Sequence, residues 1–144
     1  ADRQADIWSG IGLASCYAGP ADEKVFIDGY RLAGPSGEWF AQGIGFACSA
    51  RMSDQSMPET ICAAIRTLWD MEPEALAALV EQLRQDNVTR TRSDRPRYEA
   101  WRHSVAAAFT QNIAGRRLSD AKGIPFPPEG EREAVPSETR SQST

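Results

Sequence analysis

The sequence has few of the residues from which reactive and metal sites are made. It contains one histidine and three cysteines in 144 residues. An odd number of cysteines at wide spacing does not indicate a disulfide framework, and none of them shows the paired spacing of structural zinc sites. Free, buried thiols in a reducing compartment are the simpler interpretation, and we therefore expect a cytoplasmic protein.

Long apolar runs and an excess of basic charge are also missing. No stretch approaches the roughly 20 apolar residues of a membrane-spanning helix, and no signal peptide is visible. The net charge of −4 argues against a dedicated nucleic-acid binder, which is usually basic. A composition of 41% hydrophobic and 25% charged residues is that of one ordinary globular domain.

What the chain does contain is an internal repeat. The segment Gly10-Ile11-Gly12-Leu13-Ala14 returns 33 residues later as Gly43-Ile44-Gly45-Phe46-Ala47, with an aromatic residue before each copy and a cysteine after it. A period of about 33 is typical of helical-pair repeats, whose units bury their apolar faces on their neighbours. The sequence therefore predicts an all-α fold of stacked helical hairpins with a repeat of about 33 residues.

Apolar periodicity and turn residues define the expected elements. They predict six helices, at residues 3–18, 21–33, 37–53, 57–70, 73–86 and 96–113. In the first helix, the apolar stripe consists of Ile7, Ile11, Ala14 and Ala18. Beyond about residue 115 the chain becomes rich in proline and polar residues. We therefore expect a helical repeat domain at residues 1–115 and a disordered tail at residues 116–144.

The paired glycines have two interpretations. A dinucleotide-binding loop needs a preceding strand and a third glycine, and neither is found here. Glycine inside a helix costs about 1 kcal/mol relative to alanine. Two such residues at matched positions therefore favour a close approach between helices over a phosphate site.

The candidate reactive residues remain without a defined partner. His103 could serve catalysis with Cys16, Cys48 or Cys62, but no local signature supports such a pair, and ordinary structural roles are the simpler interpretation. The acidic candidates are Asp28, Asp70, Glu72 and Glu99. An arginine-rich segment with Arg90, Arg92, Arg95 and Arg97 could contact an anion or form a solvated loop. The catalytic residues thus stay unknown, and we expect neither a cofactor nor a metal.

Four tryptophans offer a second kind of candidate site. They are Trp8, Trp39, Trp69 and Trp101. Large aromatic side chains of this kind either pack in the core or line a groove for a flat or polyene-like apolar ligand.

An ordered series of motifs resembles one known family. It begins with Ala5-Asp6-Ile7-Trp8-Ser9-Gly10-Ile11-Gly12-Leu13-Ala14, and continues through Tyr17-Ala18-Gly19, Ala41-Gln42-Gly43, Phe46-Ala47, Ala50-Arg51, Pro58-Glu59-Thr60 and Tyr98-Glu99-Ala100-Trp101-Arg102. The series resembles a bacterial family of unknown function often labelled "enediyne biosynthesis protein", over roughly residues 3–110. Members of that family are about twice as long. This chain looks like their C-terminal portion, so we expect it to be part of a longer protein.

The resemblance implies a place in polyketide or enediyne-type secondary metabolism. We therefore expect a non-catalytic accessory or binding protein that takes a hydrophobic small molecule or a partner synthase. One alternative is an enzyme that modifies a hydrophobic polyketide intermediate, and another is a protein-interaction scaffold. The resemblance implies no catalytic residues, and we expect no nucleic-acid partner and no membrane span.

Overall fold

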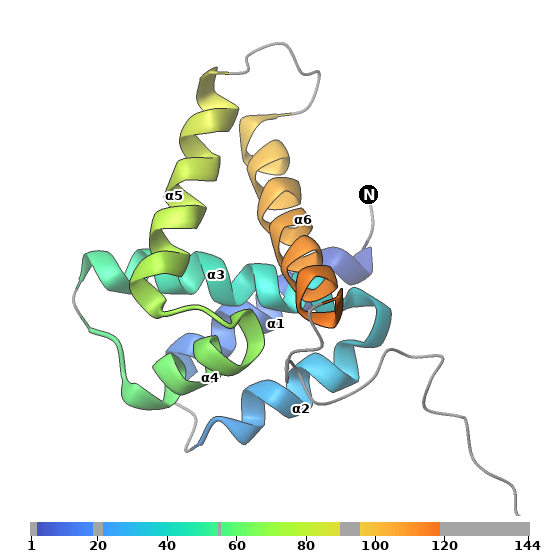
Figure 1. The fold of residues 1–144 in the computed structure, drawn as a ribbon, viewed down its shortest axis with the longest axis vertical. Helices are drawn as coiled ribbons and strands as arrows, with labels where there is room; N and C mark the ends of the chain where they lie inside the picture. The colour runs from blue at the N-terminus through green and yellow to red at the C-terminus, as the bar shows by residue number, and fades with distance from the viewer. Residues whose placement is uncertain (1–2, 19–21, 55, 90–95, 119–144) are drawn as a thin grey trace, which may run out of the picture.

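The computed structural model describes residues 3–18, 22–54, 56–89 and 96–118, and within these ranges it contains helices and no strand. The helices are α1 (Arg3–Ala18), α2 (Lys24–Ala33), the short 3₁₀ helix η1 (Gly34–Ser36), α3 (Gly37–Ser53), α4 (Glu59–Trp69), α5 (Pro73–Thr89) and α6 (Arg97–Leu118) (Figure 1). The prediction of an all-α fold is confirmed. Each of the six predicted helices corresponds to one of α1 to α6.

The helix ends differ from the predicted ones by a few residues. Helix α2 begins at Lys24, and the Asp22 carboxylate accepts a hydrogen bond of 2.8 Å from the Lys24 backbone N–H just before the first turn. Helix α6 continues to Leu118, past the expected domain boundary at residue 115. The remainder of the expected tail, residues 119–144, lies outside the described residues, so its disorder stays a prediction.

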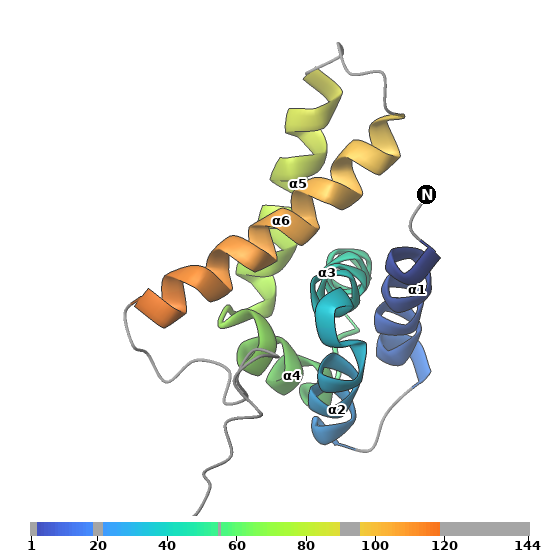
Figure 2. The same ribbon diagram turned by 90° about the vertical axis from the view of Figure 1, so that its right-hand side faces the viewer.

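Helix α3 is the centre of the fold. It lies between α1 on one side and the antiparallel pair of α5 and α6 on the other (Figure 2), and it also contacts α2. Nine of its 17 residues are buried, among them Phe40, Ile44, Ala47 and Cys48. A helix that is apolar or small on all sides can be covered on all sides, and this composition explains its central position.

Helices α1 and α3, which carry the two copies of the repeat, pack side by side and run in the same direction. Near their N-terminal ends, the rings of Trp8 and Phe40 meet edge to face with centroids 6.2 Å apart. Near their C-terminal ends, Arg51 Nη1 donates a hydrogen bond of 2.6 Å to the Cys16 carbonyl oxygen. Between them, Ser9 Oγ donates a hydrogen bond of 2.6 Å to Gln42 Oε1, across the same spacing of 33 residues as the repeat.

Two glycines allow the backbones of α1 and α3 to approach this closely. A Cβ atom on Gly12 would overlap with the Phe40 carbonyl oxygen, and a Cβ atom on Gly43 would overlap with the Ser9 carbonyl oxygen. Neither contact leaves room for any other residue, because the obstructing atoms are backbone atoms. Close helix packing is therefore the role of these two glycines, whereas the prediction is wrong for Gly10, which has no atom within 4 Å of its Cβ position.

The later helices also bury apolar side chains in the core. The fully buried side chains are Ile61, Ile65, Leu68 and Trp69 of α4, Leu76 and Val80 of α5, and Val105 and Phe109 of α6. Trp69 lies among them with its ring centroid 5.0 Å from that of Phe109, and its Nε1–H donates a hydrogen bond of 3.1 Å to the Ala41 carbonyl oxygen. The core is thus continuous from α4 to α3 and α6.

The apolar stripe of α1 does not face the core. Ile7 is 45% exposed and Ile11 is 41% exposed, and Ala14 and Ala18 are also exposed. The buried side of α1 instead carries the small residues Ala5, Gly12 and Cys16. Contact with α3 selects this side because only small residues permit the short distance between the two backbones.

The expected repeat of stacked hairpins is not confirmed. The main neighbour of α1 is α3, whereas α2 lies across the lower side of α3 and makes few contacts with α1 (Figures 1 and 2). The two sequence copies thus form one parallel helix pair, with α2 as the connection that returns the chain to its starting end.

Gly43 has no space for a side chain and Gly10 has space for one, so substitution by alanine should change the stability of the fold in opposite directions at these two positions. We expect Gly43→Ala to lower the free energy of unfolding by about 1–3 kcal/mol, because the added methyl group overlaps with backbone. Gly10→Ala is expected to raise it by about 0.5–1 kcal/mol, because no atom lies within 4 Å of its Cβ position and alanine is the better helix former.

Urea denaturation followed by circular dichroism measures both values. Equal effects of the two substitutions would contradict the assigned packing.

Candidate functional site

A buried arginine joins the first and last helices. The Arg102 side chain on α6 is 9% exposed, and its Nη1 lies 2.9 Å from Asp6 Oδ1 on α1 and 2.8 Å from Glu99 Oε1 one turn earlier on α6. The two carboxylates are partly in water, with side chains 57% and 40% exposed. Arg102 therefore connects α6 to α1 through a contact between residues that are 96 positions apart in the sequence.

Aromatic rings and the single histidine surround this ion pair. The Arg102 guanidinium carbon lies 5.4 Å from the centroid of the Trp39 ring and 6.0 Å from that of Tyr98. The His103 ring meets Trp39 edge to face with centroids 4.9 Å apart, and His103 Nε2 lies 3.9 Å from Glu99 Oε2. We call this group the Arg102 cluster; its members are Asp6, Trp39, Tyr98, Glu99, Arg102 and His103.

The electrostatics of the Arg102 cluster favour a fixed ion pair. Burial alone would lower the pKa of the Arg102 guanidinium, but the hydrogen bonds to Glu99 and Asp6 outweigh it and raise the pKa. The cluster therefore holds a permanent cation between two carboxylates. Two buried donors, Arg102 Nε and Gln42 Nε2, have no acceptor among the described residues.

The structure does not bring His103 to a thiol. The contacts of His103 are with Trp39 and Glu99, whereas Cys48 Sγ lies 3.3 Å from the Pro73 carbonyl oxygen and Cys62 Sγ lies 4.0 Å from that of Met57. No hydrogen bond joins His103 to a cysteine within the described ranges. The arrangement that a Cys–His nucleophile requires is thus not formed here.

The three thiols are buried and protonated. Burial raises the pKa of Cys16 to about 12, with repulsion from an ionised Cys48 as a smaller cause, and burial likewise raises the pKa of Cys48 to about 12. Burial first and the charge of Glu59 second raise the pKa of Cys62. Because the thiolate is the nucleophile, these environments favour core packing over reactivity.

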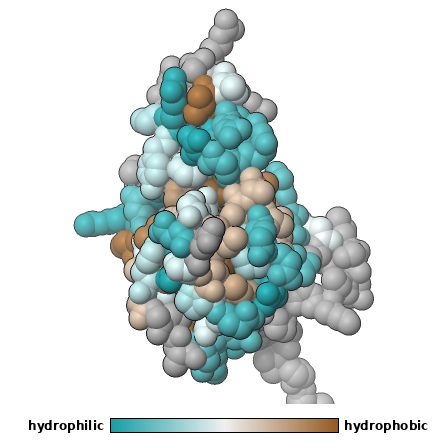
Figure 3. Space-filling view, turned by 90° about the vertical axis from the view of Figure 1, so that its left-hand side faces the viewer, coloured by the Kyte–Doolittle hydropathy of each residue, from teal (hydrophilic) through white to brown (hydrophobic). Residues whose placement is uncertain are grey.

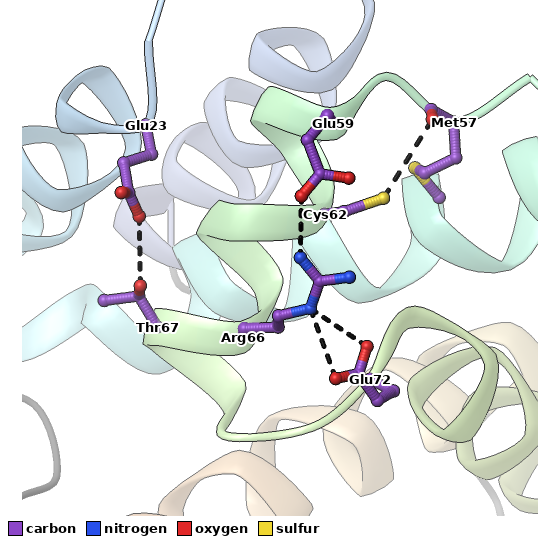
Figure 4. A network of polar contacts seen from close by, with 7 residues as sticks. All are labelled: Glu23, Met57, Glu59, Cys62, Arg66, Thr67 and Glu72. Carbon is purple, nitrogen blue, oxygen red and sulfur yellow. Dashed lines mark hydrogen bonds and ion pairs between the residues drawn. The ribbon is translucent and has the colours of Figure 1, made fainter.

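A second polar network lies on the surface of α4 (Figure 4). Arg66 Nη1 is 2.8 Å from Glu59 Oε1, and Arg66 Nε is 2.9 Å from Glu72 Oε2. Next to it, Thr67 Oγ1 donates a hydrogen bond of 3.0 Å to Glu23 Oε2, which connects α4 to the start of α2. The Glu59 and Glu72 side chains are 78% and 61% exposed, and this network is therefore an ordinary solvated ion-pair network.

The predicted acidic candidates do not share a groove. Asp28 pairs with Lys24 at 2.6 Å on α2, Glu72 pairs with Arg66, and Glu99 belongs to the Arg102 cluster. Asp70 ends α4 in the left-handed backbone conformation, with φ 54°. Of the arginine-rich segment, Arg90, Arg92 and Arg95 lie outside the described residues.

The four tryptophans have separate structural partners. Trp69 is fully buried, and Trp101 Nε1–H donates a hydrogen bond of 2.9 Å to the Val80 carbonyl oxygen. Trp8 packs on Phe40, and Trp39 packs on Arg102 and His103. Core and helix-to-helix packing therefore accounts for each of them, and they do not line one common groove.

One surface that the sequence analysis missed is the solvent-facing side of α1. Its exposed apolar residues include Ile7, Ile11, Leu13 and Tyr17, the last of which is 53% exposed. Gly10, at the middle of this side, has no atom within 4 Å of its Cβ position. We call this surface the α1 outer face; it consists of Ile7, Gly10, Ile11, Leu13, Ala14 and Tyr17.

The α1 outer face is open because α1 is an edge helix. In Figure 2, α1 lies at the margin of the fold with α3 on its inner side, and no described helix covers its other side. The left-hand side of the molecule in Figure 1 has a mixed surface, with hydrophilic residues around a smaller apolar area (Figure 3). The sequence marks Ile7 and Ile11 as an apolar stripe, but it carries no signal that this stripe is exposed.

Neither a metal centre nor a membrane span is found in the described part of the chain. No group of three or more His, Cys, Asp or Glu residues there could hold a metal ion. None of the described helices is both long and apolar enough to cross a membrane.

A family model described as "Protein of unknown function (DUF1702)" matches residues 1–109, and the chain therefore belongs to this family. No curated protein and no solved structure matches the chain.

We expect Arg102→Met to lower the free energy of unfolding by about 2 kcal/mol, because it removes two charge-assisted hydrogen bonds from a buried side chain while keeping its apolar stem. The matched control is Arg66→Met, which removes two exposed ion pairs and should cost less than about 1 kcal/mol. Urea denaturation of both variants tests the comparison. A larger effect at Arg66 would mean that the Arg102 cluster does not hold α6 to α1.

The thiol environments predict low reactivity and a pH effect of defined sign. At pH 8, iodoacetamide should label the folded chain slowly, with Cys62 first, since it is 9% exposed and Cys16 and Cys48 are fully buried. Stability should fall as the pH rises above 9, because the unfolded chain then loses thiol protons that folded Cys16 and Cys48 keep up to about pH 12.

Mass spectrometry of the labelled peptides, with a guanidinium-unfolded control, measures the order of labelling. Fast labelling of Cys16 would contradict its buried position.

Proposed function

We propose that this member of the DUF1702 family is a non-catalytic accessory or binding protein of bacterial polyketide or enediyne-type secondary metabolism, acting in the cytoplasm. The resemblance of its ordered motif series to proteins labelled for enediyne biosynthesis supports the metabolic setting. The α1 outer face supports a binding role, and this is the single observation on which the proposal depends.

The α1 outer face has the character of an interaction surface. Four large apolar side chains on one short helix, namely Ile7, Ile11, Leu13 and Tyr17, are between 38% and 53% exposed. Clustered exposed apolar residues on a soluble protein mark sites for partners, since their burial removes apolar area from water.

The shape of this surface favours a protein partner. Small-molecule sites are concave and enclose most of the ligand surface, whereas the outer side of an edge helix is convex. Of the two partners that the resemblance implies, a biosynthetic synthase therefore fits the α1 outer face better than a free hydrophobic intermediate.

A charge on this face should prevent binding. We expect Ile11→Glu to weaken capture of a synthase at least about tenfold, because burial of the new carboxylate is costly. The matched control is Leu32→Glu on α2, where the replaced side chain is 76% exposed and lies on a different helix. It should capture the synthase as the unmodified chain does.

The measurement is native mass spectrometry of the chain, purified from a host that also expresses the neighbouring biosynthetic genes. Retention of an apolar small molecule in place of a synthase would contradict a protein partner. Turnover of a model polyene that is lost in His103→Ala would contradict the non-catalytic role and support an enzyme.

A further inference from the structure

The parallel pair of α1 and α3 shows how one copy of the repeat receives another. Gly43 of α3 lies directly under the Ser9 carbonyl oxygen of α1, and the Phe40 backbone lies against Gly12. The receiving helix thus contributes a glycine with an aromatic residue one turn before it. The incoming helix contributes its small-residue side.

The α1 outer face repeats the receiving surface of α3. Counting back 33 residues, Gly10 corresponds to Gly43, and Ile7 corresponds to Phe40. Gly43 is filled by backbone, whereas no atom lies within 4 Å of the Cβ position of Gly10. Helix α1 therefore carries the same combination of a glycine and a large apolar side chain one turn before it. No described helix packs on this combination in α1.

We propose that the α1 outer face receives a helix of a partner protein, and that this helix presents small residues at the spacing that α1 itself presents to α3. In α1 that spacing is formed by Ala5, Ser9, Gly12 and Cys16. The partner helix runs parallel to α1, as α1 runs parallel to α3. The inference rests on the proposed binding role and specifies the kind of partner.

A second copy of this chain cannot supply this helix through its own α1. The small-residue side of α1 is already packed against α3. Ala5 is 5% exposed, Cys16 is fully buried, and Gly12 lies against the Phe40 backbone. The occupant must therefore bring a further helix of this class.

A synthetic copy of α1 is a suitable probe. The peptide has the sequence of residues 3–18, a fluorescein label, and a hydrocarbon staple joining positions 7 and 11 on the side away from Gly12. The staple is needed because an isolated helix of this length is only marginally stable in water. The matched control peptide carries Gly12→Leu, which fills the side that must approach the receiving backbone.

Two glycine substitutions in the whole chain form the other half of the test. Gly10→Leu fills the proposed docking position. Gly115→Leu on α6 is the control, since both glycines are helical and neither has an atom within 4 Å of its Cβ position. For that reason both variants should keep the melting temperature of the unmodified chain or exceed it.

Fluorescence anisotropy should show saturable binding of the peptide to the unmodified chain and to Gly115→Leu. Binding should weaken at least tenfold for Gly10→Leu and for the Gly12→Leu peptide. If the peptide bound Gly10→Leu as tightly as the unmodified chain, the inference would be overturned. Such binding would not use the α1 outer face, and would mean that the peptide had taken the place of α1 on α3. Absence of saturable binding would overturn it as well.

Light scattering after size-exclusion chromatography measures the oligomeric state and so tests whether a second copy of the chain occupies this face. A dimer that Gly10→Leu abolishes would identify a second copy and overturn the inference. The proposed function is tested separately. If the chain captures a synthase through Ile11 but does not bind the peptide, the proposed function stands and the inference of a small-residue helix is wrong.

Discussion

The contact between the α1 and α3 backbones is the constraint from which the rest of the fold follows. At Gly12 and at Gly43, a backbone carbonyl group of the neighbouring helix occupies the position where a side chain would begin. Because the two helices are parallel, the chain must return to its starting end between them, and α2 makes this return. The close pair also leaves α3 with its other sides free to receive α5 and α6.

The polar contacts of the fold secure this arrangement. The hydrogen bond from Ser9 to Gln42 fixes the register of α1 on α3, and Arg102 attaches α6 to the start of α1. Removal of one partner from such a contact is costly, because the other group then loses its hydrogen bond. In the Arg102 cluster the partners are the carboxylates of Asp6 and Glu99, which both pair with the buried cation.

The proposed partner surface follows from the same geometry. An edge helix that contacts its neighbour through small residues must turn its larger residues outward, and in α1 these are Ile7, Ile11, Leu13 and Tyr17. In α3 the counterparts of Ile7 and Ile11 are Phe40 and Ile44, and both are buried because α3 also packs against α2, α5 and α6. For these two positions, the difference between the copies lies in the neighbours of each helix.

The sequence by itself determined the helical class and the places of the six helices, because periodicity and turn residues are local properties. The cost of interior glycine predicted close packing for the glycines of both copies, but only the structure shows that Gly12 and Gly43 pack on backbone while Gly10 is open. It could not determine which side of α1 is buried. The stripe with Ile7 and Ile11 is the more apolar one, but contact with α3 requires the side with Gly12. Nor could it show that Arg102 meets Asp6, or that His103 meets Trp39, since these contacts join residues far apart in the chain. Only the tertiary structure decided them, because backbone distance between packed helices selects the side of each helix that is buried.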